Sequence, residues 1–112
     1  MFLSACGREV PVLEGMDMDK WKSDRNACLG YRKEAAPILK SEMIKLKGLP
    51  ESDILTLLGR PDQNELYKRN QKFYSYFLSP GPNCHTPDSS AEKLIIRFNA
   101  VGYAQQVSIG ED

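Results

Sequence analysis

The 112-residue sequence contains no run of about 18 consecutive apolar residues, the length that a transmembrane helix requires. It also lacks net charge, because 15 lysine and arginine residues balance 15 aspartate and glutamate residues. A neutral surface gives no electrostatic reason to expect nucleic acid or an anionic membrane surface as a partner. A hydrophobic fraction of 41% and a charged fraction of 27% are ordinary for a folded globular protein of one domain.

Histidine is nearly absent, and the one residue of this type, His85, directly follows Cys84. Two adjacent ligands without a second cluster rarely build a zinc site. A Ser-His-Asp site would need an activated serine, yet the nearby Asp88, Ser89 and Ser90 belong to no nucleophile-elbow motif. We therefore expect a solvated histidine, and the sequence predicts no enzyme, catalytic residue, metal, cofactor or small-molecule substrate.

Cysteine is also scarce, and its count of three is odd. In an oxidising compartment this number indicates one disulfide and one thiol with a separate role. Cys28 lies on a predicted helix and Cys84 in a proline-rich loop that needs restraint, so we predict a disulfide between them. The chain-entropy model gives about 4 kcal/mol for closing a loop of that length. The sequence has no C-x-x-C spacing, which disfavours a redox-active pair.

The remaining cysteine, Cys6, ends the stretch Leu-Ser-Ala-Cys at residues 3–6 and precedes a glycine. This stretch resembles the lipobox of bacterial lipoproteins, in which the cysteine thiol receives a diacylglycerol unit before the leader is cleaved. Stable anchoring takes more than one acyl chain, each contributing about 0.8 kcal/mol per buried CH₂. The basic and apolar leader that such export needs is expected upstream of Met1. We expect residues 1–16 to be a lipobox remnant and flexible tether; the alternative is a free thiol in a disordered tail.

Helical patterns occupy the first half of the domain that we expect over residues 17–112. A helix is predicted from Asp17 or Asp19 through residue 29, with Gly30 as a break. A second helix is predicted over residues 31–46, kinked or begun by Pro37. A third, short helix begins near residue 50 and ends at Gly59.

Strand patterns occupy the second half of the chain. The first predicted strand, residues 71–78, is rich in aromatic side chains. The second, residues 93–99, alternates between the two faces, with Leu94, Ile96 and Phe98 inward and Lys93 outward. Residues 101–109 form a third strand. A hairpin with Gly102 joins the last two strands, and residues 79–90 form a Pro/Gly/Ser-rich loop. We also expect Tyr103, Val107 and Ile109 to lie together. This order predicts an α+β fold, with N-terminal helices packed on one face of a three-stranded antiparallel meander in two layers.

The stretch over residues 46–61, LKGLPESDILTLLGRP, resembles the motif of the SmpA/OmlA (BamE-like) lipoproteins, G-hydrophobic-x-x-x-x-V/I-x-x-L-L-G-x-P. The matching residues are Gly48, Ile54, Leu57, Leu58, Gly59 and Pro61. The resemblance covers roughly residues 46–109 and implies a small antiparallel sheet after the motif, a unit also related to beta-lactamase inhibitor protein domains. Family members are outer-membrane lipoproteins of envelope assembly. The longer helical section, the internal cysteines and the loop at residues 79–90 depart from the family pattern.

Together these features predict a non-enzymatic, lipid-anchored protein of the bacterial cell envelope that faces the periplasm. The outer membrane is favoured over the inner membrane as the site of the anchor. Its expected partner is another envelope protein, and its only membrane contact is the N-terminal lipid. Tyr67, Tyr74 and Tyr76 are the candidate binding surface, because tyrosine supplies contact area at low entropy cost. The alternatives are an inhibitor of a periplasmic or secreted enzyme, acting through the loop at residues 79–90, and an enzyme whose site is a pocket of convergent polar groups.

Overall fold

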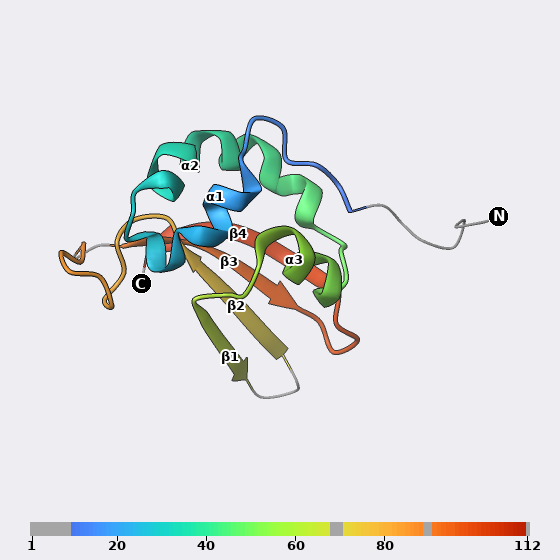
Figure 1. Cartoon of the computed structure of the whole chain (residues 1–112). Coiled ribbons are helices and arrows are strands. Elements are labelled where there is room, and N and C mark those ends of the chain that lie inside the picture. Colours follow the sequence, from blue (N-terminus) through green and yellow to red (C-terminus); the bar gives the residue numbers. More distant parts are fainter. Residues whose placement is uncertain (1–9, 68–70, 89–90, 112) are drawn as a thin grey trace.

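The computed structural model describes residues 10–67, 71–88 and 91–111, which form an α+β fold (Figure 1). No helix among these residues has the length and apolar character needed to cross a membrane. The elements, in chain order, are α1 (Met18–Ser23), η1 (Arg25–Ala27), α2 (Tyr31–Glu42), η2 (Met43–Leu46), α3 (Glu51–Leu58), β1 (Gln63–Tyr67), β2 (Gln71–Phe77), β3 (Glu92–Phe98) and β4 (Ala104–Glu111).

The strands form one antiparallel sheet in the order β1-β2-β3-β4. The sheet therefore has four strands, not the predicted three, because β1 pairs along its whole length with β2. The sequence of β1, QNELY, is mostly polar and lacks the alternation that identifies a half-buried strand. This strand depends on its neighbour for its conformation, which explains why the local pattern missed it.

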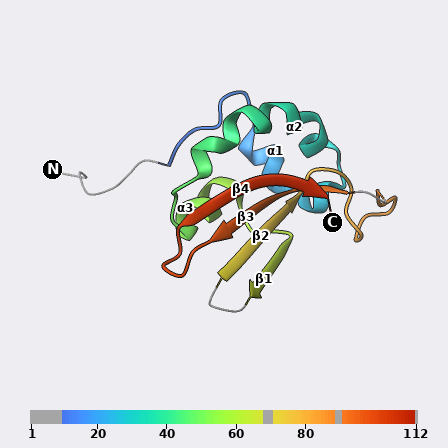
Figure 2. The ribbon, with the colours of Figure 1, turned by 180° about the vertical axis from the view of Figure 1, so that it is seen from behind.

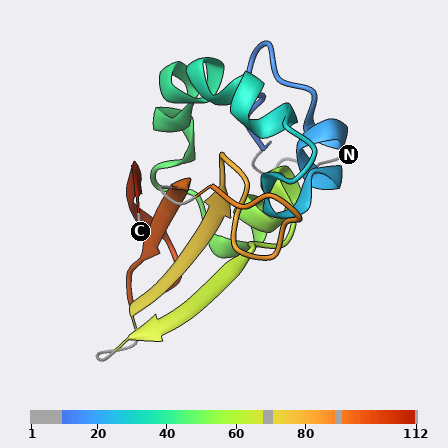
Figure 3. The same cartoon turned by 90° about the vertical axis from the view of Figure 1, so that its left-hand side faces the viewer.

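The main core joins side chains from the helices to side chains of β2, β3 and β4. Figure 3 shows the sheet from the side, with the helices gathered above it. Leu94, Ile96 and Phe98 are buried as predicted, and Tyr74 lies directly opposite Ile96 in the β2–β3 register. The other fully buried large side chains of this core are Leu13, Trp21, Leu39, Leu46, Ile54, Leu58, Tyr76 and Leu78.

The predicted helical section is present but is divided differently. The expected helix over residues 17–29 ends at Ser23 and continues as the separate turn η1. Pro37 lies inside α2 rather than in its first turn. Gly59 ends α3 with φ of 80°, a left-handed conformation that other residues rarely adopt. A Cβ added at this position would lie 3.1 Å from the side chain of Lys22. This close contact is a second steric reason for glycine at the end of the helix.

Three finer expectations are corrected by the structure. The segment over residues 10–16, expected to be part of a flexible tether, packs on the domain through Leu13, which is only 1% exposed. Lys93, expected to point outward into solvent, is 7% exposed, and its ammonium group donates a hydrogen bond to the side chain of Gln63. A register shift at Arg97/Phe98 breaks the alternation of the last strand, so Tyr103 is 42% exposed whereas Val107 and Ile109 pack against the core.

Candidate functional site

The structure places Cys28 and Cys84 in the geometry of a disulfide, with sulfur atoms 2.01 Å apart and Cα atoms 5.4 Å apart. The pair ties the turn between α1 and α2 to the loop between β2 and β3. A backbone hydrogen bond supports the same connection, since Gly81 N–H donates to the carbonyl of Asn26 at 3.0 Å; within the loop, Asp88 N–H donates to the carbonyl of Pro80 at 2.9 Å. The loop is therefore fixed at its base from two directions.

The turn that receives this loop has an unusual backbone. Asn26 and Ala27 both have φ of 60°, although neither is glycine. For alanine this region costs free energy and persists only when surrounding contacts impose it. Ala27 is fully buried in a small cluster with Phe77 and Ala91. The ring of Phe77 lies so close to Gly81 that an added Cβ would be 2.8 Å from it, so the loop can approach only with glycine here.

A buried ion pair lies under the same turn. Arg32 Nη1 and Asp62 Oδ2 are 2.6 Å apart, and both side chains are fully inaccessible to solvent. The carboxylate of Asp62 also accepts backbone hydrogen bonds from Asn26 at 3.1 Å and from Phe77 at 2.9 Å. Arg25, which is partly exposed, adds a contact of 3.4 Å to Oδ1. One carboxylate thus holds η1, α2 and β2 together.

The guanidinium of Arg32 lies over the ring of Trp21, with its central carbon 4.5 Å from the ring centroid. Its Nε donates to the carbonyl of the same tryptophan at 3.1 Å, while Nη2 has no hydrogen-bond partner among the described residues. Burial lowers the pKa of Arg32, and the neighbouring Asp62 partly opposes this shift. The group stays in the core because its charge is matched by Asp62 and its plane is stacked on an aromatic ring.

A second buried carboxylate, Asp24, supplies the cap that α2 lacks. The residue before this helix is Gly30, which has no side chain to accept a hydrogen bond. Asp24 instead accepts the backbone N–H groups of Leu29 at 2.6 Å and Arg32 at 2.9 Å. Sequence reasoning missed Asp24, Arg32 and Asp62, because their partners come from four separate elements and no local spacing marks them.

Two of the three candidate surface tyrosines are corrected by the structure. Tyr74 is 3% exposed and Tyr76 is 0% exposed, so neither contributes to a binding surface. Their hydroxyl groups are engaged internally: Tyr74 donates to Glu51, and Tyr76 donates to the carbonyl of Gly59 at 2.8 Å. Burial raises the pKa of both tyrosines. The side chain of Tyr67 lies outside the described residues.

The Tyr74 hydroxyl belongs to a half-buried polar cluster at the start of α3. Lys72 Nζ is 3.1 Å from Glu51 Oε2, the same carboxylate oxygen that accepts the hydrogen bond from Tyr74. Burial opposes ionisation of Glu51, but the hydrogen bonds from Tyr74 and Lys72 outweigh it and lower the pKa of this carboxyl. The cluster joins α3 to β2, so its role is to hold two elements together.

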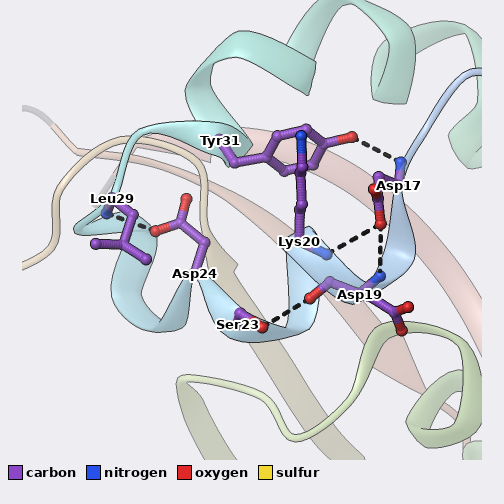
Figure 4. A pocket seen from close by; sticks show the side chains of 7 residues that line it. All are labelled: Asp17, Asp19, Lys20, Ser23, Asp24, Leu29 and Tyr31. Carbon is purple, nitrogen blue, oxygen red and sulfur yellow. Dashed lines mark hydrogen bonds between the residues drawn. The ribbon is translucent and has the colours of Figure 1, made fainter.

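A shallow pocket of about 370 Å³ opens beside α1, as Figure 4 shows. Its polar groups have structural partners: Asp17 caps α1 through the N–H groups of Asp19 and Lys20, and Tyr31 accepts the N–H of Asp17 at 2.7 Å. Lys20 lies 5.9 Å from the centroid of the Tyr31 ring. The carboxylates of Asp17 and Asp24 cap helices, and no group of three or more potential metal ligands occurs in the described ranges.

The remaining predicted sites are placed as follows. Cys84 is bonded to Cys28 and cannot act with His85 as a pair of metal-binding residues; His85 itself is exposed on the loop. Cys6, Ser89 and Ser90 lie outside the described residues, so lipidation at Cys6 stays a prediction.

Comparison with known proteins identifies no relative. No protein-family model, curated protein or solved structure matches the chain. The resemblance to the SmpA/OmlA lipoproteins therefore remains an expectation from the motif at residues 46–61, and it enters below as part of a proposal.

Proposed function

We propose that this chain is an exported envelope protein, anchored by lipid at Cys6, whose rigid domain binds another protein without catalysing a reaction. The observation that carries the proposal is the pairing of Cys28 with Cys84. Disulfides persist in oxidising compartments and are rare in the reducing cytosol. The pairing therefore supports export, and the lipobox-like stretch at residues 3–6 and the SmpA/OmlA-like motif favour the outer membrane, facing the periplasm.

The interior supports binding rather than chemistry. Asp24 and Asp62 accept backbone hydrogen bonds, and the two buried tyrosine hydroxyls donate to groups of the same domain. A two-layer arrangement, with helices on one face of the sheet, would leave the other face and the sheet edges for a partner. Buried polar networks of this kind rigidify a domain, and a rigid surface loses less entropy when it binds.

A second candidate function is inhibition of a periplasmic or secreted enzyme through the loop at residues 79–88. The favouring observation is that the base of this loop is fixed by the disulfide and by the Gly81–Asn26 hydrogen bond. Its tip is exposed at Pro82, Asn83 and residues 85–88, and Figure 1 shows it projecting beyond the end of the sheet. A protruding segment held in one conformation suits insertion into a cleft.

The test of the main proposal is crosslinking in native envelopes, followed by affinity purification of the tagged full chain. We expect one dominant protein partner, incorporation of labelled fatty acid, and loss of both label and membrane association in Cys6→Ala. A cytosolic, unlabelled protein with free Cys28 and Cys84 thiols would refute the proposal. If the purified domain instead inhibits a secreted enzyme and Pro82→Gly weakens that inhibition, the second candidate is favoured.

A further inference from the structure

The outer edge of β4 is open along most of its length. This strand is last in the sheet order, and Figure 2 shows it from behind, with α2 running above it. Near its start the edge is covered: Ala104 N–H donates to the carbonyl of Leu49 at 2.8 Å and Ala104 accepts the N–H of Gly48 at 2.8 Å. Beyond this point, residues 105–110 have no backbone partner outside the sheet among the described residues.

The hydrogen-bond ladder shows which groups of β4 point away from the sheet. Leu78 N–H donates to the carbonyl of Glu92, so Glu92 and every second residue after it on β3 bond toward β2. Residues 93, 95 and 97 then bond toward β4, where their partners in the register are residues 110, 108 and 106. The residues between them, Val107 and Ile109, therefore turn their N–H and carbonyl groups outward.

This edge lacks the devices that usually protect an edge strand. Residues 105–110 read Gln-Gln-Val-Ser-Ile-Gly and contain no lysine, no proline and no charge. Native sheets normally block such edges with charges, prolines, bulges or a covering element, because an open edge recruits a further strand. The register shift at Arg97/Phe98 places one extra residue, Gln105, at the start of the open section, and residues 106–110 continue in regular register with β3.

A groove of about 200 Å³ runs beside the same edge, between the end of the helical segment and β4. Its lining consists of Lys40, Met43, Ile44, Lys47, Gln105, Gln106 and Val107. Ile44 is 69% exposed, so its side chain is accessible to a partner that enters the groove. An apolar cavity of roughly 150 Å³ admits a benzene-sized group, so this groove has room for one medium-sized apolar side chain.

The charge of the groove is one-sided. Lys40 and Lys47 are exposed at its rim, and no carboxylate is among the lining residues. The nearest ion pair in the sequence, between Glu42 and Lys45, is formed by residues that do not line the groove. A partner that reaches the edge strand therefore meets the apolar side chains of Met43, Ile44 and Val107 together with two lysines.

We infer that the β4 edge and this groove bind an extended, acidic peptide segment of another protein by strand addition. The inference rests on the proposed protein-binding function and names its surface and the chemistry of its partner. The backbone of the segment pairs with Val107 and Ile109, one apolar side chain enters the groove beside Ile44, and a glutamate or aspartate contacts Lys40 or Lys47. Backbone pairing gives affinity, and the pocket and the lysines give specificity.

The charges favour a foreign segment over a second copy of this chain. A two-fold pairing of β4 with β4 would bring Lys40 and Lys47 of both copies to one seam, and the one carboxylate of β4, Glu111, lies at the end of the strand, outside the open section. Like charges at an interface disfavour association.

The test uses the full, oxidised chain and two synthetic peptides of about ten residues. Both alternate valine with threonine; one carries two glutamates and the other carries lysines at the same positions. We expect the glutamate peptide to bind about tenfold more tightly, a difference of about 1.4 kcal/mol. In its presence, amide hydrogen exchange at Val107 and Ile109 should slow at least several-fold. Equal binding of the two peptides, or unchanged exchange at both amides, would overturn the inference.

Matched variants separate the groove from the rest of the surface. Ile44→Gln and Lys40→Glu/Lys47→Glu should each weaken the glutamate peptide about tenfold. The controls are Val101→Gln, which removes another exposed apolar side chain, and Lys33→Glu, which reverses an exposed charge on the same helix. The controls should bind as the unchanged protein does. A dimer in sedimentation that Ile44→Gln abolishes would mean that a second copy is the occupant, against the inference.

Site-specific crosslinking in envelopes distinguishes failure of this inference from failure of the proposed function. A photoreactive residue at position 106 should capture the partner, whereas one at position 33 should not. If a partner is captured only away from β4, the edge is refuted but the binding function stands. If no partner is captured at any surface position, the proposed function fails.

Discussion

Replacing Asp62 by alanine should destabilise the domain more than any loss of an exposed ion pair. The substitution leaves the guanidinium of Arg32 buried without its counter-charge, and it removes the acceptor of two backbone N–H groups, from Asn26 and Phe77. Breaking a buried pair by removing one partner costs about 3–5 kcal/mol. A domain of this size has about 5–15 kcal/mol of stability in total, so the variant should be close to the limit of folding.

The companion variants separate the charge from the hydrogen bonds. Arg32→Met should cost less than Asp62→Ala, because the carboxylate keeps Asn26, Phe77 and the exposed Arg25 as partners. The double variant should recover part of the loss by removing the orphaned charge. It should not recover all of it, since each buried N–H without an acceptor costs about 1–3 kcal/mol.

The assay is urea unfolding of the oxidised protein at neutral pH. Free energies of unfolding are compared between variants for which this free energy falls with urea concentration at the same slope. Lys45→Met is the matched control, because it breaks the exposed Lys45–Glu42 pair and should change stability by only about 0–1 kcal/mol. If Asp62→Ala costs no more than this control, the buried pair is not what holds the turn, and the reasoning is wrong.

Three further predictions test other parts of the structure. Replacing Cys28 and Cys84 by serine should lower the free energy of unfolding by up to about 4 kcal/mol in urea under non-reducing conditions, because the open chain regains its loop entropy. Gly81→Ala should cost about 1–3 kcal/mol in the same assay, because its Cβ would overlap the ring of Phe77. Glu51 has a lowered pKa in the folded state, so its contribution to stability is full above the ordinary glutamate pKa of about 4.3 and is lost as the pH falls through the lower folded value. Glu51→Gln should therefore flatten the decline of stability in acid, as measured by thermal unfolding from pH 6 downward.

Each of these three has a control and a contrary outcome. Thiol labelling of the native, untreated protein should leave Cys28 and Cys84 unmodified; rapid labelling of both would contradict the disulfide. Gly110→Ala is the control for Gly81→Ala, because its Cβ would meet Ile95 at an ordinary 3.9 Å. For Glu51, an unchanged acid profile in the glutamine variant would show that this carboxylate is not stabilised by folding.

Local signals were sufficient to locate the helical section and three of the four strands, although not every helix boundary. Gly30 separates two helical segments and Gly59 ends α3, as the sequence predicts. Both residues have positive φ, which glycine adopts without steric cost, so the signal is local. The sequence also assigns Tyr74, Tyr76 and Leu78 to one face of the same strand. It cannot say which face is buried, because that depends on the register with β3, in which Tyr74 lies opposite Ile96 and Tyr76 opposite Leu94.

Features that depend on distant partners were beyond the sequence. β1 is a strand because β2 pairs with it, and its own residues give little indication. Arg32 lies in the first turn of α2, where the sequence pattern suggests an exposed charge. Its partner Asp62 comes after α3 in the chain, so only the folded structure brings the two side chains together. The β4 groove combines residues of the segment 40–47, which spans the end of α2 and η2, with residues of β4 about 60 positions later in the chain, so no motif could indicate it.

The turn containing Asn26 couples the loop to the ion pair. Its N–H donates to Asp62, and its carbonyl accepts the N–H of Gly81, so one residue contacts both the buried carboxylate and the base of the loop. Reduction of the disulfide would leave the Gly81–Asn26 bond and the packing of Phe77 in place, because neither depends on the sulfur atoms. The core contacts of Gly81 and Phe77 and the Cys28–Cys84 disulfide therefore hold the base of the loop independently of each other.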